Sequence, residues 1–171
     1  MNIDQNEVTK FAEQADKWWD KEGDFKPLHK INPLRASYIN DIVNLENKNF
    51  LDVGCGGGIL TEAIFDKGAF VTGIDAAGPG IETARIHAKK NSKNINYIVG
   101  TAEEFYEKND DRFDVVSCLE VLEHVPDPKS LIDVCTKLLK PGGDLFLSTI
   151  NKNPRSWVTA IVGAEYIFNI L

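Results

Sequence analysis

A short apolar run that leads into a cluster of glycines constrains the fold of this 171-residue chain most strongly. Residues 50–58 read Phe-Leu-Asp-Val-Gly-Cys-Gly-Gly-Gly, and Gly73-Ile74-Asp75 ends the next apolar run. The pattern predicts a strand, a glycine turn and a helix start, where bare backbone N–H groups approach a ligand. Asp75 follows Gly54 at about the 20-residue spacing that lets a carboxylate accept hydrogen bonds from ribose hydroxyls. The motif therefore predicts a site for a nucleoside cofactor.

The glycine pattern separates two cofactor classes that use such a turn. A dinucleotide-binding turn carries G-x-G-x-x-G, and Ile59 stands here at the position of the third glycine. The chain instead has acidic Asp52 near the end of the strand and three consecutive glycines. This arrangement resembles the first motif of S-adenosylmethionine-dependent methyltransferases, whose ligand has no phosphate. We therefore expect Asp52, Gly54, Gly56 and Asp75 to bind S-adenosylmethionine, with NAD as the alternative.

Short β-like runs alternate with helical stretches, which is typical of a parallel sheet covered by helices on both faces. The predicted fold class is α/β, of the Rossmann-like class I methyltransferase type. We expect strands near 49–54, 69–74, 95–99, 113–118 and 144–149, and helices over 58–67, 79–91 and 128–139. The stretch 140–143, Lys-Pro-Gly-Gly, predicts a break between the last helix and the fifth strand.

Ahead of the sheet, apolar residues at helical spacing predict an amino-terminal helix that includes Val8, Phe11, Ala12, Ala15, Trp18 and Trp19. The composition of residues 18–35, dense in aromatic, charged, proline and glycine residues, predicts a surface loop. We expect one domain over 1–171, divided into an amino-terminal helical or lid segment (1–45), a cofactor-binding core (46–150) and an apolar helix (151–171).

Composition favours a single globular domain that acts on small molecules. A chain of this length with 43% hydrophobic residues can bury a sizeable core. Its net charge of −7 leaves no basic stripe to neutralise phosphates, so nucleic acid is not expected as a partner. The three cysteines lack a C-x-x-C pair, and the amino terminus is polar and acidic. These features predict a reducing cytoplasmic location without a signal peptide, disulfide framework or zinc site.

The ligand of an open parallel sheet lies beyond the carboxyl ends of the strands, so residues that directly follow each strand are the site candidates. Ala102 and Glu103 follow the third strand, where methyltransferases commonly contact the adenine. Glu103 fits equally well as a cap of the short helix that follows.

Acidic and imidazole side chains follow the fourth strand. If this stretch turns helically, Glu120, Glu123 and His124 share one face, because they stand at i, i+3 and i+4. Such a group can hold a divalent cation, and Glu123 and His124 can act as an acid–base pair beside the substrate. The alternative is that Glu123 and His124 only fix the loop by hydrogen bonds.

Several segments together resemble the ubiquinone biosynthesis O-methyltransferases. They are Trp-Trp-Asp at 18–20, Phe-Lys-Pro-Leu-His at 25–29, the glycine motif, Glu-His-Val-Pro-Asp at 123–127 and Val-Gly-Ala-Glu-Tyr at 162–166. The resemblance runs from about residue 11 to residue 171. It implies transfer of a methyl group from S-adenosylmethionine to a phenolic oxygen of a polyprenyl-hydroxyphenol and of demethylubiquinol.

Site residues follow from the same resemblance. It places cofactor contacts on Arg35, Gly54, Asp75 and Leu119, with Arg35 suited to a bidentate grip on the methionine carboxylate and a surface ion pair as its alternative role. Some family members resemble metal-assisted enzymes, which implies Mg²⁺ at Glu120, Glu123 and His124 to lower the pKa of the phenol. His29 is a second candidate general base, and tethering of a loop is its alternative role.

The apolar stretch 157–171 is too short, and too interrupted by Glu165, for a membrane span. It predicts a helix on the bilayer surface, with Trp157, Ile161, Phe168 and Leu171 as contacts, and hence a peripheral location on the inner face of the cell membrane. A helix that covers the active site is the alternative. The resemblance also allows membership in a ubiquinone-biosynthesis complex.

Relatives in the class finish their sheet with a sixth and a seventh strand, so the chain looks truncated after its fifth strand. Two alternative functions follow: a truncated, non-catalytic S-adenosylmethionine-binding domain, and a methyltransferase that acts on another small phenol.

Overall fold

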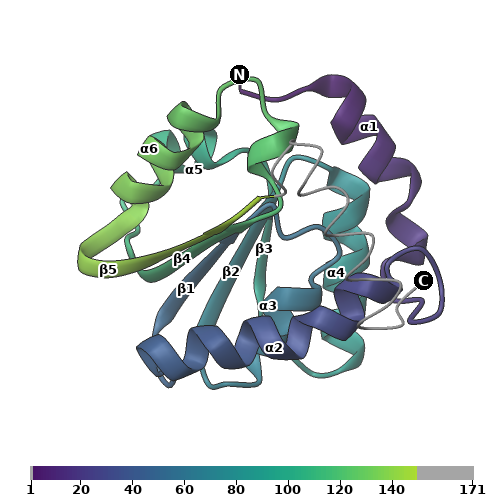
Figure 1. Ribbon diagram of the computed structural model, residues 1–171, viewed down its shortest axis with the longest axis horizontal. Helices are drawn as coiled ribbons and strands as arrows, with labels where there is room; N and C mark the ends of the chain where they lie inside the picture. The colour runs from purple at the N-terminus through teal and green to yellow at the C-terminus, as the bar shows by residue number, and fades with distance from the viewer. Residues whose placement is uncertain (1, 150–171) are drawn as a thin grey trace, which may run out of the picture.

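A computed structural model describes residues 2–149 of the chain. Within that range, five parallel strands form one sheet in the order β3-β2-β1-β4-β5 (Figure 1). The strands are β1 (Asn49–Val53), β2 (Phe70–Asp75), β3 (Asn96–Val99), β4 (Phe113–Leu119) and β5 (Leu139–Ser148). The predicted α/β class and its five parallel strands are confirmed. Residues 151–171, with the predicted apolar helix and its membrane contacts, lie outside the described residues.

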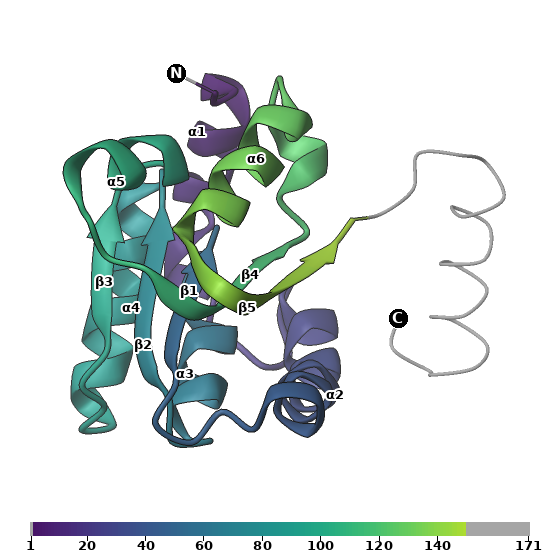
Figure 2. The same cartoon turned by 90° about the vertical axis from the view of Figure 1, so that its left-hand side faces the viewer.

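Helices cover both faces of the sheet. Figure 2 shows α5 (Ala102–Lys108) and α6 (Pro128–Leu138) on one face, and α2 (Lys26–Val43), α3 (Ile59–Phe65) and α4 (Gly78–Lys90) on the other. An amino-terminal helix, α1 (Gln5–Glu13), and two short 3-10 helices, η1 (Ala15–Lys17) and η2 (Leu122–His124), complete the described chain. No helix within residues 2–149 has the length and apolarity that a membrane span requires.

Alternating side chains of the central strands build a core on each face. Val116 of β4 packs with Leu138 of α6 in one cluster, whereas Phe50 of β1 packs with Ile39 of α2 and Ile64 of α3 in another. Each of these side chains is at most 2% exposed. Burial on both faces explains why the strands read as nearly continuous apolar runs.

The amino-terminal region differs from its prediction. The expected helix through Trp19 ends at Glu13, and the surface loop expected over 18–35 contains the first ten residues of the 18-residue helix α2. Pro27 lies in the first turn of α2, where a missing N–H costs no helical hydrogen bond. Ala36 and Ile39 then bury one side of α2 against the sheet. Tertiary packing therefore overrides the loop-like composition.

The fifth strand also differs from its prediction, because it begins at Leu139 instead of 144. Phe113 of β4 pairs with Leu139, but Val115 pairs with Asp144, so residues 140–143 form an irregularity within the ladder. Gly142 supports this bend with a left-handed φ of +79°. The Lys-Pro-Gly-Gly stretch therefore lies within β5 and bends the strand, instead of separating α6 from it as predicted.

The strand order places a topological switch point beside β1. From β1 the chain continues to β2 on one side, whereas β4 lies on the other side after a crossover through α5. In open parallel sheets, ligands bind in the crevice beyond the carboxyl ends of the strands at such a point. The loops that follow β1, β2 and β4 therefore define the candidate site.

Candidate functional site

The turn after β1 adopts a backbone that only glycine tolerates well. Gly54, Gly56 and Gly58 have φ values of +74°, +51° and +87°, in the left-handed region. A Cβ on Gly54 would lie 2.3 Å from Cγ2 of Val121, so a side chain would also collide with the loop after β4. The Gly54 and Cys55 N–H groups donate to the Ile74 carbonyl at 2.8 and 3.1 Å, which fixes the turn against β2.

Asp75 at the tip of β2 holds the glycine turn from the other side. Its Oδ2 accepts the Gly56 N–H at 2.8 Å, and its Oδ1 accepts the Ala77 N–H at 2.7 Å. Burial raises the pKa of Asp75, and these two backbone donors oppose the shift. The predicted proximity of the glycine turn and Asp75 is thus a direct hydrogen bond. Each carboxylate oxygen of Asp75 can still accept a further hydrogen bond.

Asp52 lies within β1 and is 3% exposed. Its Oδ1 accepts a 2.6 Å hydrogen bond from the Ser117 hydroxyl on the neighbouring strand β4. Burial raises the pKa of Asp52 to about 7, and the nearby carboxylate of Asp75 adds to the increase. The carboxyl group therefore changes its protonation state close to neutral pH. It lies next to the carboxyl end of β1, which borders the predicted cofactor crevice.

Asp52 should make the stability of the fold depend on pH. Its pKa is higher in the folded chain than the ordinary value near ~4, so the folded chain binds the proton more tightly and loses stability as pH rises toward 7. We expect Asp52→Asn to gain about 2–3 kcal/mol of unfolding free energy over the wild type between pH 5 and pH 8.

Urea unfolding at both pH values measures this difference. Asp114→Asn is the control, because the pKa of Asp114 is lowered, so this carboxyl is already ionised at pH 5 and above. The control should differ from the wild type by the same amount at both pH values. Parallel pH profiles for Asp52→Asn and the wild type would contradict the assignment.

Arg35, on α2, lies at the carboxyl ends of the strands, where the glycine turn and Asp75 also lie. Its Nη2 lies 3.0 Å from Oε1 of Glu120, directly after β4, and the Ser148 hydroxyl donates to the same oxygen at 2.7 Å. Glu120 has a left-handed φ of +58°, which is uncommon for a residue with a side chain. Leu119, the other residue predicted here, is the last residue of β4. Arg35 is thus held near the carboxyl end of β4 by a partly buried carboxylate.

The three predicted metal ligands do not come together. Glu120 pairs with Arg35, Glu123 accepts a 2.8 Å hydrogen bond from the Thr149 hydroxyl, and Nδ1 of His124 lies 2.6 Å from Oε2 of Glu7. Residues 2–149 contain no group of three histidine, cysteine, aspartate or glutamate side chains placed to hold a metal ion. The predicted shared helical face is wrong, because left-handed Glu120 precedes the short 3-10 turn. In this arrangement the three side chains do not fit Mg²⁺.

His29 and Glu103 also have defined partners. Nε2 of His29 lies 2.8 Å from the Trp18 carbonyl, which is the geometry of the loop-tethering alternative. Ala102 begins α5, but Thr101 caps that helix by accepting the Glu104 N–H. Glu103 instead accepts a hydrogen bond from the Asn2 amide at 3.2 Å.

Sequence reasoning missed a contact at the glycine turn. The Trp18 indole covers the turn: a Cβ on Gly56 or Gly57 would lie 2.4 Å from its ring atoms. Trp19 donates its indole N–H to the Gly57 carbonyl at 2.9 Å. The available signal was the Trp-Trp pair, which the helical spacing assigned to an amino-terminal helix that packs onto the domain.

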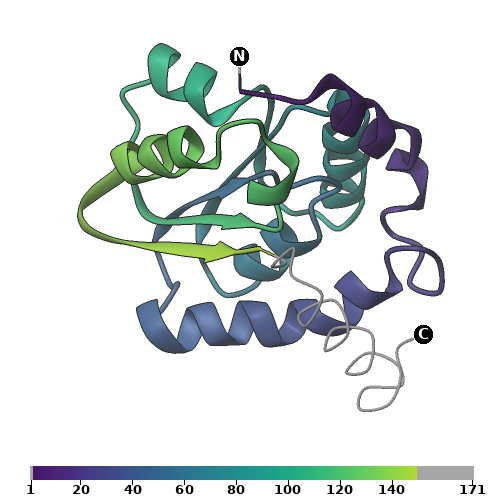
Figure 3. The same ribbon diagram turned by 45° about the horizontal axis from the view of Figure 1, so that its top comes forward.

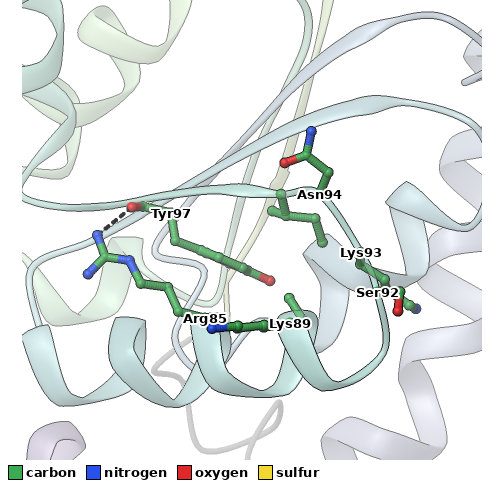
Figure 4. A pocket seen from close by; sticks show the side chains of 8 residues that line it. Arg85, Lys89, Ser92, Lys93, Asn94 and Tyr97 are labelled. Atoms are coloured by element: carbon green, nitrogen blue, oxygen red, sulfur yellow. Dashed lines mark hydrogen bonds between the residues drawn. The ribbon is translucent and has the colours of Figure 1, made fainter.

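A separate cavity of about 320 Å³ lies between the end of α4 and the start of β3 (Figure 4). Its lining includes Arg85, Lys89 and Lys93, and the Arg85 guanidinium donates to the Tyr97 carbonyl at 2.6 Å. Lys93 is already paired with Glu62 and Asp66. This cavity borders the amino end of β3, whereas the glycine turn follows the carboxyl end of β1, so the cavity is not the predicted crevice.

Comparisons with known proteins agree with this geometry. Residues 51–147 match the family model described as a methyltransferase domain. The chain is 53% identical over 171 residues to the ubiquinone biosynthesis O-methyltransferase of Saccharophagus degradans, covering all of this chain and 72% of the relative. It is 52% identical over 170 residues to the Pseudomonas fluorescens protein of the same name, covering 99% of this chain and 73% of the relative.

Among solved structures, the magnesium protoporphyrin IX methyltransferase of Synechocystis, determined with bound S-adenosylmethionine, is similar in fold. Its TM-score is 0.69 at 19% identity, over 95% of this chain and 87% of that chain. The match to the Saccharophagus degradans relative covers the whole chain, and therefore includes the glycine turn, Asp75 and the amino-terminal segment. The chain therefore belongs to the ubiquinone biosynthesis O-methyltransferase family and carries its methyltransferase domain.

Proposed function

We propose that this chain binds S-adenosylmethionine at the carboxyl ends of β1, β2 and β4 and methylates phenolic oxygens of a polyprenyl-hydroxyphenol and of demethylubiquinol. The contact between Asp75 and the glycine turn, at 2.8 Å, is the observation that carries the proposal. A carboxylate and a glycine backbone lie together at the switch point of the sheet, as recognition of the ribose of a nucleoside cofactor requires. The names of the curated relatives support the acceptor class.

Each proposed cofactor contact has a separate task. Asp75 would orient the ribose, and Arg35 would hold the methionine carboxylate, for which the Glu120 carboxylate is a matching substitute in this structure. Asp52, with its Ser117 hydrogen bond, would support the turn from below. Ala102, the first residue of α5, and Leu119, the last residue of β4, would line the adenine side of the site. When bound, S-adenosylmethionine supplies an electrophilic methyl group.

The acceptor needs help from the protein, because a phenol with a pKa near ~10 is a weak nucleophile at neutral pH. The site must remove its proton and hold oxygen, methyl carbon and sulfur in line. We propose Glu123 and His124, in the loop after β4, as the groups that take the proton. The carboxylate of Glu7 lies 2.6 Å from Nδ1 of His124 and would hold the orientation of the imidazole ring. His29, already bonded to a carbonyl, is the second candidate base.

Equilibrium titration with S-adenosylhomocysteine, in parallel with NADH, tests the cofactor assignment. We expect saturable binding of S-adenosylhomocysteine and none of NADH, because Ile59 replaces the glycine that a dinucleotide needs. Binding of NADH alone would overturn the proposal. Cofactor binding without transfer to any phenol would favour the non-catalytic alternative, and transfer only to unprenylated phenols would favour the other substrate class.

Two finer proposals concern partners and location. We propose peripheral contact with the inner face of the cell membrane, because a prenylated acceptor partitions into the bilayer. Membership in a ubiquinone-biosynthesis complex is proposed for the same reason. Co-sedimentation with anionic liposomes tests the membrane contact, and failure to co-sediment would remove it. Chelation of divalent ions should leave the transfer rate unchanged, because Glu120, Glu123 and His124 have separate partners instead of a shared Mg²⁺ site.

A further inference from the structure

The segment that precedes α2 crosses the predicted crevice as a belt. We define the amino-terminal belt as residues 2–25, which contain α1 and η1. Figures 1 and 3 show it starting beside the connections that follow β3 and β4 and running along α4. Helix α1 buries no residue, and the belt inserts only Ala15 and Phe25 into the protein at 6% and 7% exposure. The belt has no hydrophobic core of its own. A small number of specific contacts therefore hold it against the rest of the protein.

One end of the belt is fastened at the glycine turn. The Trp18 ring lies over Gly56 and Gly57 and stacks on Phe25 with ring centroids 4.1 Å apart. Trp19 donates to the Gly57 carbonyl, and it stacks on His87 of α4 at 3.4 Å with the rings within 6° of parallel. The aromatic pair thus connects the turn after β1 to the helix after β2.

The other end of the belt is fastened at the loops after β3 and β4. The Asn2 side chain both donates to the Asp127 carbonyl and accepts the Asp127 N–H, each at 2.8 Å. The same amide donates to Glu103. Glu7 faces His124, and Phe11 meets the His124 ring edge to face at 5.2 Å. The belt therefore joins the turn after β1 and helix α4 to the segments that follow β3 and β4.

The indole nitrogen of Trp18, in the belt, indicates that a ligand binds beside it. The indole nitrogen of Trp18 is buried and has no hydrogen-bond partner among the described residues. Buried N–H groups in native proteins almost always have a partner, so an unpaired one at the glycine turn calls for an acceptor that arrives from outside the described chain. S-adenosylmethionine carries hydroxyl and carboxylate acceptors.

We propose that Trp18 is a cofactor-positioning residue whose indole N–H donates to the bound cofactor, and that the amino-terminal belt must open for the cofactor to exchange. The inference rests on the proposed S-adenosylmethionine site. A segment with few buried residues and a small number of discrete fastenings opens locally more readily than the sheet that it covers. Both ends of the belt should therefore control the exchange rate, although only one touches the glycine turn.

Dissociation of labelled S-adenosylhomocysteine, chased with excess unlabelled compound, tests this proposal on the full chain. Trp18→Phe keeps the aromatic cover but loses the N–H, so its affinity should fall by about 2–10-fold, the range of one hydrogen bond. Trp18→Ala removes the cover, and Glu7→Gln weakens the fastening at the far end. Both variants should release the compound several-fold faster than the wild type.

Phe70→Ala is the matched control, because it removes an aromatic side chain that is 63% exposed at the amino end of β2, away from the carboxyl ends that border the crevice. It should release the compound at the wild-type rate. Wild-type affinity in Trp18→Phe would overturn the positioning role, and wild-type release from both Trp18→Ala and Glu7→Gln would overturn the belt. Those results would leave the proposed function intact, whereas a wild-type chain that binds no S-adenosylhomocysteine would overturn both.

Discussion

Gly54→Ala is expected to weaken S-adenosylmethionine binding by about 30-fold to 5,000-fold. Its φ of +74° is unfavourable for any residue with a Cβ, at a cost of about 1–2 kcal/mol. The added Cβ would lie 2.3 Å from Val121, and relief of such overpacking costs about 1–3 kcal/mol more. The turn can relieve both only by moving, which displaces the N–H groups that face the ligand. Isothermal titration with S-adenosylhomocysteine measures the loss.

Gly142→Ala is the matched control for this prediction. Gly142 has a similar φ of +79°, but an added Cβ would meet nothing within 4 Å, and the residue belongs to β5, far along the chain from the turn. The control should lose about 1–2 kcal/mol of stability and bind the cofactor normally. Equal affinities for Gly54→Ala and the wild type would show that the ligand does not use this turn.

Asp75→Asn is expected to reduce cofactor affinity by about 10-fold to 150-fold, because a hydrogen bond to a charged acceptor contributes about 1.5–3 kcal/mol. The carboxylate accepts the N–H groups of Gly56 and Ala77. An amide has one oxygen, so one of these donors would face an NH₂ group and the glycine turn would lose a fastening. The amide would also be a poorer acceptor for the ribose hydroxyls.

Asp114→Asn is again the control, since Asp114 accepts the Asn49 N–H at 2.8 Å and pairs with Lys140, near the amino ends of the strands. It removes a comparable carboxylate without touching the predicted crevice. Its cofactor affinity should equal that of the wild type. An Asp75→Asn chain with unchanged affinity and unchanged KM would contradict the assignment of Asp75 to the ribose.

The sheet was predictable from sequence because its physical determinants are local. Apolar runs and the glycine turn indicated the first four strands and the helix that begins at Pro128 within a few residues. Helix α2 was not predicted as such, because its two prolines and its charges look loop-like and only burial of Ala36 and Ile39 reveals its packed side. The early start of β5 depends on pairing with β4, which no single stretch of sequence shows.

Contacts within the site were predictable only where spacing fixes them. The distance in sequence between Gly54 and Asp75 follows from one βαβ unit, so their contact could be anticipated. The pairing of Arg35 with Glu120 joins residues 85 positions apart and depends on one left-handed backbone angle. Spacing alone suggested that Glu120, Glu123 and His124 share a helical face. The left-handed φ of Glu120 is incompatible with that helix. The contact of Trp18 with the glycine turn depends on the path that the belt takes across the protein. The helical spacing of the apolar residues in the belt does not predict that path.

Transfer of a labelled methyl group from S-adenosylmethionine to a short-chain prenyl catechol and to demethylubiquinol tests the central claim most directly. The proposal predicts that both phenols become labelled, and that Asp75→Asn lowers the transfer to both because they share one cofactor site. Absence of label in both acceptors, from a chain that is folded and binds S-adenosylhomocysteine, would contradict the assignment of this chain as the methyltransferase of these phenols.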